Sequence, residues 1–449
     1  MGYKEQLNYF ALKETVTINE KDHLEIAGVD TIDLTNKYGT PLVIYDIKTV
    51  RNNIDEFKKA LASYPSEYEI SYASKAFSSM AMYQILEQEE ISVDVVSGGE
   101  LFLAKEAGFP SEKIHFHGNN KSYQELVAAL DYEIGHIIVD NFHELEMLEQ
   151  LTKKREQKMK VIIRVTPGVT ADTHKYIMTG HTDSKFGFDL KNGQAEEAVR
   201  LAQKSDFLEL SGLHMHIGSQ IFGTESYVLA MDQVLRSAKE WYISFGFQMK
   251  VLNIGGGFGI QHTPDDEAVS VKRQVETISQ ELVKLLDLYD LTYPVLQIEP
   301  GRSIVGTAGT TIYEIGSKKD IPGIRNYISI DGGMSDNIRP AMYNSKYFAS
   351  LANRMKDERT SKVSVAGKAC ESGDMLIMDL DLPEVKAGDK LAVFHTGDYA
   401  FAMASNYNRI PRPAVVFVEN GCDFLSIRRE EAKDFMRFEN HLPTNFSKR

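Results

Sequence analysis

The chain has 449 residues, of which 43% are hydrophobic and 25% are charged, a composition typical of a globular protein large enough for two domains. Its formal net charge of -14 argues against nucleic acids and anionic membranes as partners. Two cysteines, with no CxxC pair and no Cys/His cluster, predict neither a disulfide framework nor a metal site, so no metal is expected. Without a signal-like start or an apolar run long enough to span a membrane, we expect a cytoplasmic protein.

The two ends of the chain share one pattern. Residues 1–46 carry strand-like runs with few helical patterns and end in the apolar run 41–46. Residues 312–449 show the same pattern, with turns at Gly, Pro and Asp. We therefore predict one β-rich domain built from both ends, with residues 47–311 inserted as a separate domain.

The inserted segment alternates short runs rich in Val and Ile with amphipathic stretches, in which apolar residues such as Val50, Ile54 and Phe57 recur at helical spacing. Eight strand–helix units in about 260 residues match the size of a (β/α)8 barrel. Because all eight runs are short and similar, a closed TIM-type barrel is favoured over an open, doubly wound sheet. The predicted strands are residues 69–75, 92–97, 114–119, 136–141, 161–167, 211–218, 251–256 and 295–301.

Polar residues gather where these predicted strands end. In a barrel those ends meet on one face, and active sites are built there from the loops. We therefore expect the functional site on that face. The residues are Lys75, Asp94, Glu100, His115, His117, Asn119, Asp140, Asn141, Arg164, Thr166, His214, His216, Ser219, Gly255, Gly256, Gly257, Glu299 and Arg302.

Lys75 and Glu299 carry the chemistry of this prediction. A strand-end lysine is usually a surface residue, and a strand-end glutamate is usually a salt-bridge partner. Together they supply an amine that can form a Schiff base with an aldehyde and an acid that can keep a pyridine nitrogen protonated. These are the two groups that pyridoxal 5'-phosphate (PLP) requires of a protein, so we interpret the pair as a PLP site.

The glycine run at residues 255–257 can bring backbone N–H groups close to an anion. Its position after the seventh strand favours the phosphate site of a barrel over a dinucleotide-binding turn, which needs an early βαβ unit. His214 and His216 lie two apart and point the same way on a strand. As a metal pair they would lack a recognisable third ligand, whereas one of them could lie flat against a pyridine ring and Ser219 could donate to its phosphate.

The β-rich part adds two patches. Arg339 and Tyr343 are a pair suited to a carboxylate. Cys370 stands beside Glu371, and the polar residues up to Asp374 predict an exposed turn. A lone cysteine is usually buried and inert, but a thiol in an exposed turn can give a proton.

Segments spread from about residue 40 to residue 420 resemble the diaminopimelate decarboxylase family, which belongs to the fold-type III PLP enzymes. They are SYASKAF, DVVSGGEL, HFHGNNKS, GLHMHIGSQ, NIGGGFG, EPGRS, DGGMSDNIRPAMY, CESGD and MASNYNRIPRP. The resemblance implies a homodimer with shared active sites that decarboxylates meso-2,6-diaminopimelate to L-lysine and CO2, the last step of lysine biosynthesis. One departure is that Asp398 stands beside Tyr399, where the family usually has Gly-Ala-Tyr-Gly.

The resemblance also implies roles for single residues. Lys75 tethers PLP, His216 stacks on its ring and Glu299 pairs with its pyridine nitrogen. Cys370 is the implied proton donor, supplied by the other subunit. The phosphate is held by Ser219, Gly255, Gly256, Gly257, Gly301 and Arg302. The substrate is bound by Arg302, Arg339 and Tyr343 at its retained carboxylate, by Glu371 at its distal ammonium, and by Tyr399, which touches cofactor and substrate.

Two rival classes stay open at this point: another enzyme on the same scaffold, either a racemase or a decarboxylase of a basic amino acid, and a non-catalytic PLP carrier or catalytically dead regulatory homologue. A racemase on the same scaffold works better with arginine at the ring nitrogen, so Glu299 argues against it. A decarboxylase of the ornithine type has no distal carboxylate to bind, so Arg339 and Tyr343 argue against that. A non-catalytic PLP carrier should lack the lysine, the acid partner or the proton donor, and this chain keeps all three.

Overall fold

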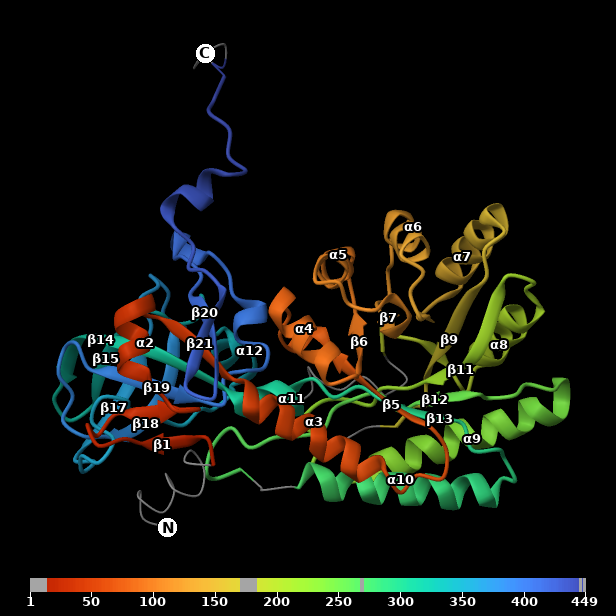
Figure 1. Ribbon diagram of the computed structural model, residues 1–449, viewed down its shortest axis with the longest axis horizontal. Coiled ribbons are helices and arrows are strands. Elements are labelled where there is room, and N and C mark those ends of the chain that lie inside the picture. The colour runs from red at the N-terminus through yellow and green to blue at the C-terminus, as the bar shows by residue number, and fades with distance from the viewer. Residues whose placement is uncertain (1–13, 170–183, 267–269, 444–445, 447–449) are drawn as a thin grey trace. The chain divides into compact units, whose positions relative to one another are not determined.

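The computed structural model describes residues 14–169, 184–266, 270–443 and 446 (Figure 1). The chain divides into two compact units. One contains the described parts of residues 49–261 and 265–307, and the other contains those of residues 1–48, 262–264 and 308–449. No helix in the described ranges has the length and apolar character needed to span a bilayer.

The first unit is a parallel barrel, as predicted. Among the described residues, eight parallel strands close on themselves in the order β9-β11-β12-β13-β5-β6-β7-β8, with β8 pairing back to β9. A further short strand, β10 (Phe188–Asp189), pairs with β9 and was not predicted. The barrel strands are β5 (Tyr68–Ala73), β6 (Ser92–Val95), β7 (Ile114–Phe116), β8 (His136–Val139), β9 (Met159–Thr166), β11 (Leu208–His214), β12 (Val251–Asn253) and β13 (Val295–Ile298).

All eight barrel strands end earlier than the sequence predicts. β12 ends at Asn253 because Gly255 and Gly257 have positive φ angles of 72° and 108°, which an extended strand does not accommodate. β13 ends at Ile298, so Glu299 lies in the loop that follows it. The chemistry-bearing residues therefore sit just past the strands, in the loops at their carboxyl ends.

Side-chain caps start several of the helices that follow the strands. Ser79, Ser97 and Asn141 each accept a backbone N–H in the first turn of the next helix, and Ser122 forms a capping box with Glu125. Each cap satisfies an orphan N–H and fixes where the loop ends. The helices are α3 (Ile47–Leu61), α4 (Met80–Gln88), α5 (Gly98–Glu106), α6 (Tyr123–Asp131), α7 (Phe142–Arg155), α8 (Gln194–Lys204), α9 (Glu225–Phe245), α10 (Val271–Leu288) and α11 (Arg302–Val305).

The second unit is β-rich and combines both ends of the chain, as predicted for the fold. Strand β4 (Leu42–Asp46) pairs with β14 (Gly309–Ile321) on one side and with β20 (Ala414–Glu419) on the other. A small sheet of β1 (Val16–Ile18), β2 (Leu24–Ile26) and β3 (Val29–Asp30) precedes helix α2 (Thr31–Tyr38). The remaining strands are β15 (Arg325–Ile330), β16 (Ala349–Leu351), β17 (Ser361–Ala366), β18 (Met375–Leu382), β19 (Lys390–Phe394) and β21 (Cys422–Ile427).

Candidate active site

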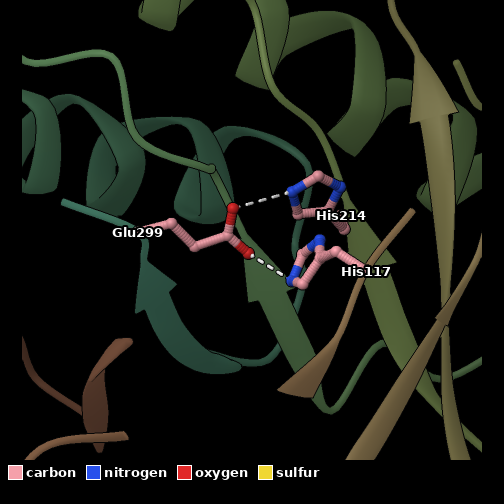
Figure 2. Close-up of side chains that lie close together, drawn as sticks. All are labelled: His117, His214 and Glu299. Carbon is pink, nitrogen blue, oxygen red and sulfur yellow. Dashed lines mark hydrogen bonds and ion pairs between the residues drawn. The ribbon is translucent and has the colours of Figure 1, made fainter. Parts of the chain in front are cut away.

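Glu299 is the centre of a buried polar cluster in the barrel (Figure 2). Its Oε1 lies 3.0 Å from Nε2 of His117 and accepts a hydrogen bond of 2.7 Å from Nδ2 of Asn253. Its Oε2 lies 3.2 Å from Nε2 of His214. The three neighbours come from β7, β11 and β12 or the residues just after them, so the barrel itself brings the cluster together.

The cluster favours an ionised Glu299 between neutral imidazoles. Burial opposes ionisation, but the contacts with His117 and His214 outweigh it and hold the pKa of Glu299 well below its usual range. Burial also lowers the pKa of His117 to about 3 and lowers the pKa of His214. Both rings are therefore neutral at physiological pH, and Nε2 of each faces an oxygen of the Glu299 carboxylate. The result is a buried negative charge that can stabilise a protonated ring nitrogen.

Asn253 connects this carboxylate to the glycine turn. While its amide nitrogen faces Glu299, its Oδ1 accepts a hydrogen bond of 2.9 Å from the N–H of Gly255. The same amide nitrogen also lies 3.2 Å from Oε1 of Gln297. Sequence reasoning missed Asn253. A lone polar residue in an apolar strand beside a strand-end glutamate is the signal that could have pointed to it.

The glycine turn is packed too closely for any other residue. A Cβ on Gly256 would lie 2.0 Å from the carbonyl oxygen of Glu299, and one on Gly257 would lie 2.4 Å from that of Gly218. The N–H of Gly256 donates to Nδ1 of His216 at 3.3 Å. The predicted phosphate residues at 255–257 thus lie beside both Glu299 and His216, two residues predicted to contact the ring.

Ser219 and Arg302 also meet in the barrel unit. Nη2 of Arg302 donates to Oγ of Ser219 at 2.9 Å. Gly301, just before Arg302, packs against the Lys75 segment, because a Cβ there would lie 2.9 Å from the Cβ of Ala73. The residues predicted to hold a phosphate are therefore next to those predicted to hold the aldehyde and the ring.

Lys75 is exposed and lies in a single 3-10 turn, Ser74–Ala76, directly after β5. Its charge acts on His216: burial, then the nearby Lys75, lower the pKa of His216 well below its usual value and keep the ring neutral. It also acts on Asp94, whose pKa is raised well above its usual range by burial and by Glu299 in spite of Lys75. Lys75, His216 and Glu299 thus share one end of the barrel.

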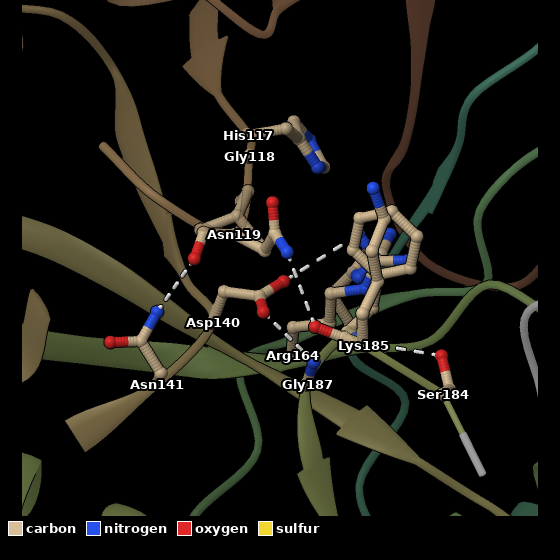
Figure 3. Close-up of polar contacts among 12 residues, drawn as sticks. His117, Gly118, Asn119, Asp140, Asn141, Arg164, Ser184, Lys185 and Gly187 are labelled. Carbon is tan, nitrogen blue, oxygen red and sulfur yellow. Dashed lines mark hydrogen bonds and ion pairs between the residues drawn. The ribbon is translucent and has the colours of Figure 1, made fainter. Parts of the chain in front are cut away.

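Other strand-end residues hold a neighbouring segment in position (Figure 3). Oδ1 of Asp140 accepts a hydrogen bond of 2.9 Å from the N–H of Gly187, and Asn119 donates to the carbonyl oxygen of Lys185 at 3.3 Å. Asn141 donates to the carbonyl oxygen of Asn119 at 3.0 Å. Nη1 of Arg164 lies 3.7 Å from Asp140. These side chains lie at the expected face, where their contacts are structural.

His115 does not join the Glu299 cluster, and the interpretation of it as a residue of the active face is wrong. Its Nε2 lies 3.1 Å from Oε1 of Glu69, near the start of β5, and its side chain is 1% exposed. Gln297 donates to the other oxygen of Glu69. His115 belongs to a polar layer deeper in the barrel, because β7 continues beyond it to Phe116.

The second unit brings together some of the residues predicted to bind the substrate. Arg339 and Tyr343 begin and end helix α12 (Arg339–Tyr343), four positions apart and so on one face. Arg339 is buried, with Nη1 3.1 Å from Oδ2 of Asp398 and its guanidinium carbon 5.6 Å from the ring centroid of Tyr399. Tyr399 has a φ of 58°, a strained backbone conformation of the kind that gathers at functional sites.

Cys370 and Glu371 are exposed in the turn between β17 and β18, as predicted. The N–H of Cys370 donates to Oδ1 of Asn408 at 2.7 Å. Asp374 differs from the prediction, because it is buried. Its carboxylate accepts hydrogen bonds of 2.7 Å and 2.8 Å from the N–H groups of Met334 and Ala369 and so braces the turn.

One grouping went unnoticed in the sequence. Within the described ranges, ligand atoms of His117, His214 and Glu299 all lie within 4.8 Å of one another, close enough to hold a metal ion. This donor set suits zinc. Nε2 of each imidazole lies against a different oxygen of the carboxylate, at 3.0 Å for His117 and 3.2 Å for His214.

Comparisons with known proteins agree with this geometry. Residues 47–306 match the family "Pyridoxal-dependent decarboxylase, pyridoxal binding domain". Diaminopimelate decarboxylase of Bacillus methanolicus is 54% identical over 93% of this chain and 97% of its own, and that of Bacillus subtilis (strain 168) is 54% identical over 94% and 96%. The crystal structure of diaminopimelate decarboxylase from M. jannaschii in co-complex with L-lysine is 31% identical, with a TM-score of 0.89 over 97% of this chain and 99% of that one.

Proposed function

Because the chain belongs to the diaminopimelate decarboxylase family of PLP-dependent enzymes, we propose that it decarboxylates meso-2,6-diaminopimelate to L-lysine and CO2, the last step of lysine biosynthesis. The observation that carries the proposal is the buried Glu299 carboxylate, held ionised by His117 and His214 at the end of the barrel that bears Lys75.

The barrel residues fit PLP. Oδ1 of Asp94, buried at the same face, has no hydrogen-bond partner within the described ranges, as expected where a ligand completes a site. Lys75 supplies the amine, Glu299 the anion for the ring nitrogen, and the glycine turn with Ser219 a cradle for a phosphate. When bound, PLP supplies an electron sink for the pair of electrons that CO2 leaves behind.

Each barrel residue then has a definite task. Glu299 holds a proton at the ring nitrogen, and its own orientation is fixed by Asn253 and the two histidines. His216, kept neutral, stacks on the ring without competing for that proton. Ser219, Gly255–Gly257, Gly301 and Arg302 bind the phosphate, whose charge suits backbone N–H groups and a guanidinium.

The substrate residues of the second unit complete the proposal. Arg302, Arg339 and Tyr343 bind the carboxylate that is retained, Glu371 binds the distal ammonium, and Tyr399 contacts both cofactor and substrate. Cys370 gives the proton that replaces CO2. Support for this part comes from the family resemblance, from the buried charge of Arg339 and from the exposure of Cys370 and Glu371.

We further propose a homodimer in which Cys370 serves the site of the other subunit. Mixing inactive Lys75→Ala chains with inactive Cys370→Ala chains tests this arrangement. If subunits exchange, one site of the mixed dimer has both residues intact and activity returns. Exchange confirmed by mass without recovered activity would contradict the shared site. The cytoplasmic location expected from the sequence stays a prediction.

A substrate panel tests the reaction itself. The purified protein with PLP should release CO2 and L-lysine from meso-2,6-diaminopimelate, and should act far more slowly on ornithine and lysine, which lack the distal carboxylate. Arg339→Gln should reduce the difference in rate between meso-2,6-diaminopimelate and the other two substrates, because it removes the cation proposed to bind the distal carboxylate. Equal rates on all three substrates would contradict the proposal and favour a general decarboxylase of basic amino acids.

A further inference from the structure

Asp398 is a buried carboxylate in direct contact with the arginine proposed to bind the substrate. Its side chain is 0% exposed, that of Arg339 is 6% exposed, and Nη1 of Arg339 lies 3.1 Å from its Oδ2. We propose that Asp398 is an internal counter-ion that lowers the affinity of Arg339 for the carboxylate shared by substrate and product. This inference rests on the proposed function, since it takes Arg339 as the ligand of that carboxylate.

The contact leaves part of the guanidinium available. Arginine has five N–H donors in a planar fork. Asp398 contacts Nη1 through Oδ2 at 3.1 Å and through its carbonyl oxygen at 3.5 Å. Nη2 makes a long contact of 3.4 Å with Oγ of Ser345, and the buried Nε has no hydrogen-bond partner in the described part of the chain. A second carboxylate can therefore bind on the Nε side while Asp398 keeps Nη1.

The second carboxylate oxygen of Asp398, Oδ1, is in contact with His262. Nε2 of His262 lies 3.4 Å from Oδ1 of Asp398. The His262 ring packs edge-on against Tyr347, with the ring centroids 5.7 Å apart, and both side chains are buried. Asp398 is thus fixed between His262 and Arg339, so an arriving carboxylate adds to it and does not displace it.

The electrostatic consequence is a weaker site for anions. Burial opposes the charge of Arg339, but Asp398 together with Tyr347 and Tyr399 outweighs burial and raises the pKa of the guanidinium. The cation is therefore already compensated before a ligand arrives, and a bound carboxylate meets the like charge of Asp398 across one guanidinium. Without Asp398, the buried cation would be uncompensated and would gain much more from the ligand.

The effect applies to the product as well as the substrate. Decarboxylation removes the carboxylate at the reacting carbon, so L-lysine keeps the one at the distal centre. A counter-ion on Arg339 weakens the binding of both molecules. The affinity for the substrate is therefore lower, and L-lysine is released faster. Asp398 is in this account a positioning and tuning residue that acts through Arg339.

The test is the inhibition constant of L-lysine in the holoenzyme. Asp398→Asn keeps the shape and an acceptor for Nη1 while removing the charge. We expect L-lysine to bind roughly tenfold more tightly, a change of about 1.4 kcal/mol, with KM for the substrate falling more than kcat changes. Binding of 1,5-diaminopentane, which has no carboxylate, should stay the same. Unchanged or weaker inhibition by L-lysine in the folded variant would overturn the inference.

A matched control separates this effect from general loss of stability. Asp389 is also buried and pairs with an arginine of the same unit, Arg354, at 2.6 Å. Asp389→Asn should lower the melting temperature without tightening L-lysine binding, and equal tightening in both variants would refute the specific role of Asp398. If Asp398→Asn does not fold, Asp398→Ala, which restores the residue usual in the resembling family, provides the same comparison.

The proposed function and this inference fail in different ways. If the parent enzyme forms no L-lysine from meso-2,6-diaminopimelate, the function is wrong whatever the variants do. If the parent makes L-lysine but calorimetry finds equal affinity of parent and Asp398→Asn for L-lysine, the function stands and the inference is wrong.

Discussion

Lys121 should be one of the most important residues for the stability of the barrel unit. Its ammonium donates to the carbonyl oxygens of Gly118 and Ile138, at 2.9 Å and 2.7 Å, and to Oε1 of Glu144 at 2.8 Å. The side chains of Lys121 and Glu144 are only 1% and 2% exposed. The three protons of the ammonium thus tie the segment after β7 to β8 and to helix α7.

Lys121→Met removes the cation and keeps most of the volume. Breaking a buried pair by removing one partner costs about 3–5 kcal/mol, because the other charge is left uncompensated. Burial already raises the pKa of Glu144 even with Lys121 beside it. Without Lys121 that pKa rises further. The variant should therefore lose more stability as the pH rises above about 4, the pKa of a glutamate in the unfolded chain.

Urea unfolding of the parent and the variant measures the loss directly. Lys121→Met with Glu144→Gln should recover part of the stability, because neither charge is then buried alone. Lys59→Met is the control, since Lys59 and Asp55 form an exposed pair that should contribute little to stability. A loss below 1 kcal/mol in Lys121→Met, with no dependence on pH, would refute this account of the buried pair.

Four further outcomes follow from the site and the second unit. Lys75→Ala should lose the visible absorption of the tethered cofactor and nearly all turnover; an active variant with bound PLP would rule out Lys75 as the tether. Glu299→Gln should keep PLP but slow decarboxylation on the order of a hundredfold, and unchanged turnover would mean another partner for the ring nitrogen. Glu371→Ala should lose turnover far more than PLP binding, and full catalytic efficiency would exclude its role at the distal ammonium. Burial raises the pKa of Asp336 to about 7, so the free energy of unfolding should fall as the pH rises from about 4 to 7, and a parent profile as flat as that of Asp336→Asn would contradict it.

The sequence predicts the strands well and their ends less well. Runs rich in Val and Ile identify all eight barrel strands, because a parallel strand buried on both faces must be apolar. The predicted ends run too far, since Gly255 and Gly257 allow the chain to turn sooner. The neighbours of Glu299 could not be predicted in advance, because His117, His214 and Asn253 come from separate strands and meet only when the barrel closes.

The charge pairs of the second unit could not be predicted from the sequence either. Asp398 could be noted beside Tyr399, but its contact with Arg339 joins residues 59 positions apart. Asp374 was placed in an exposed turn because its neighbours are polar, and the structure buries it as a brace for backbone N–H groups. Local polarity predicts exposure on average and fails where a carboxylate satisfies the backbone.

Turnover of meso-2,6-diaminopimelate in D2O tests the central claim most directly. The proposed reaction should release CO2 with an equal amount of L-lysine that carries a single deuterium, at the carbon that lost the carboxylate. It should also require PLP and fail in Lys75→Ala. Deuterated diaminopimelate without release of CO2 would contradict the account and identify the protein as a racemase or epimerase on the same fold.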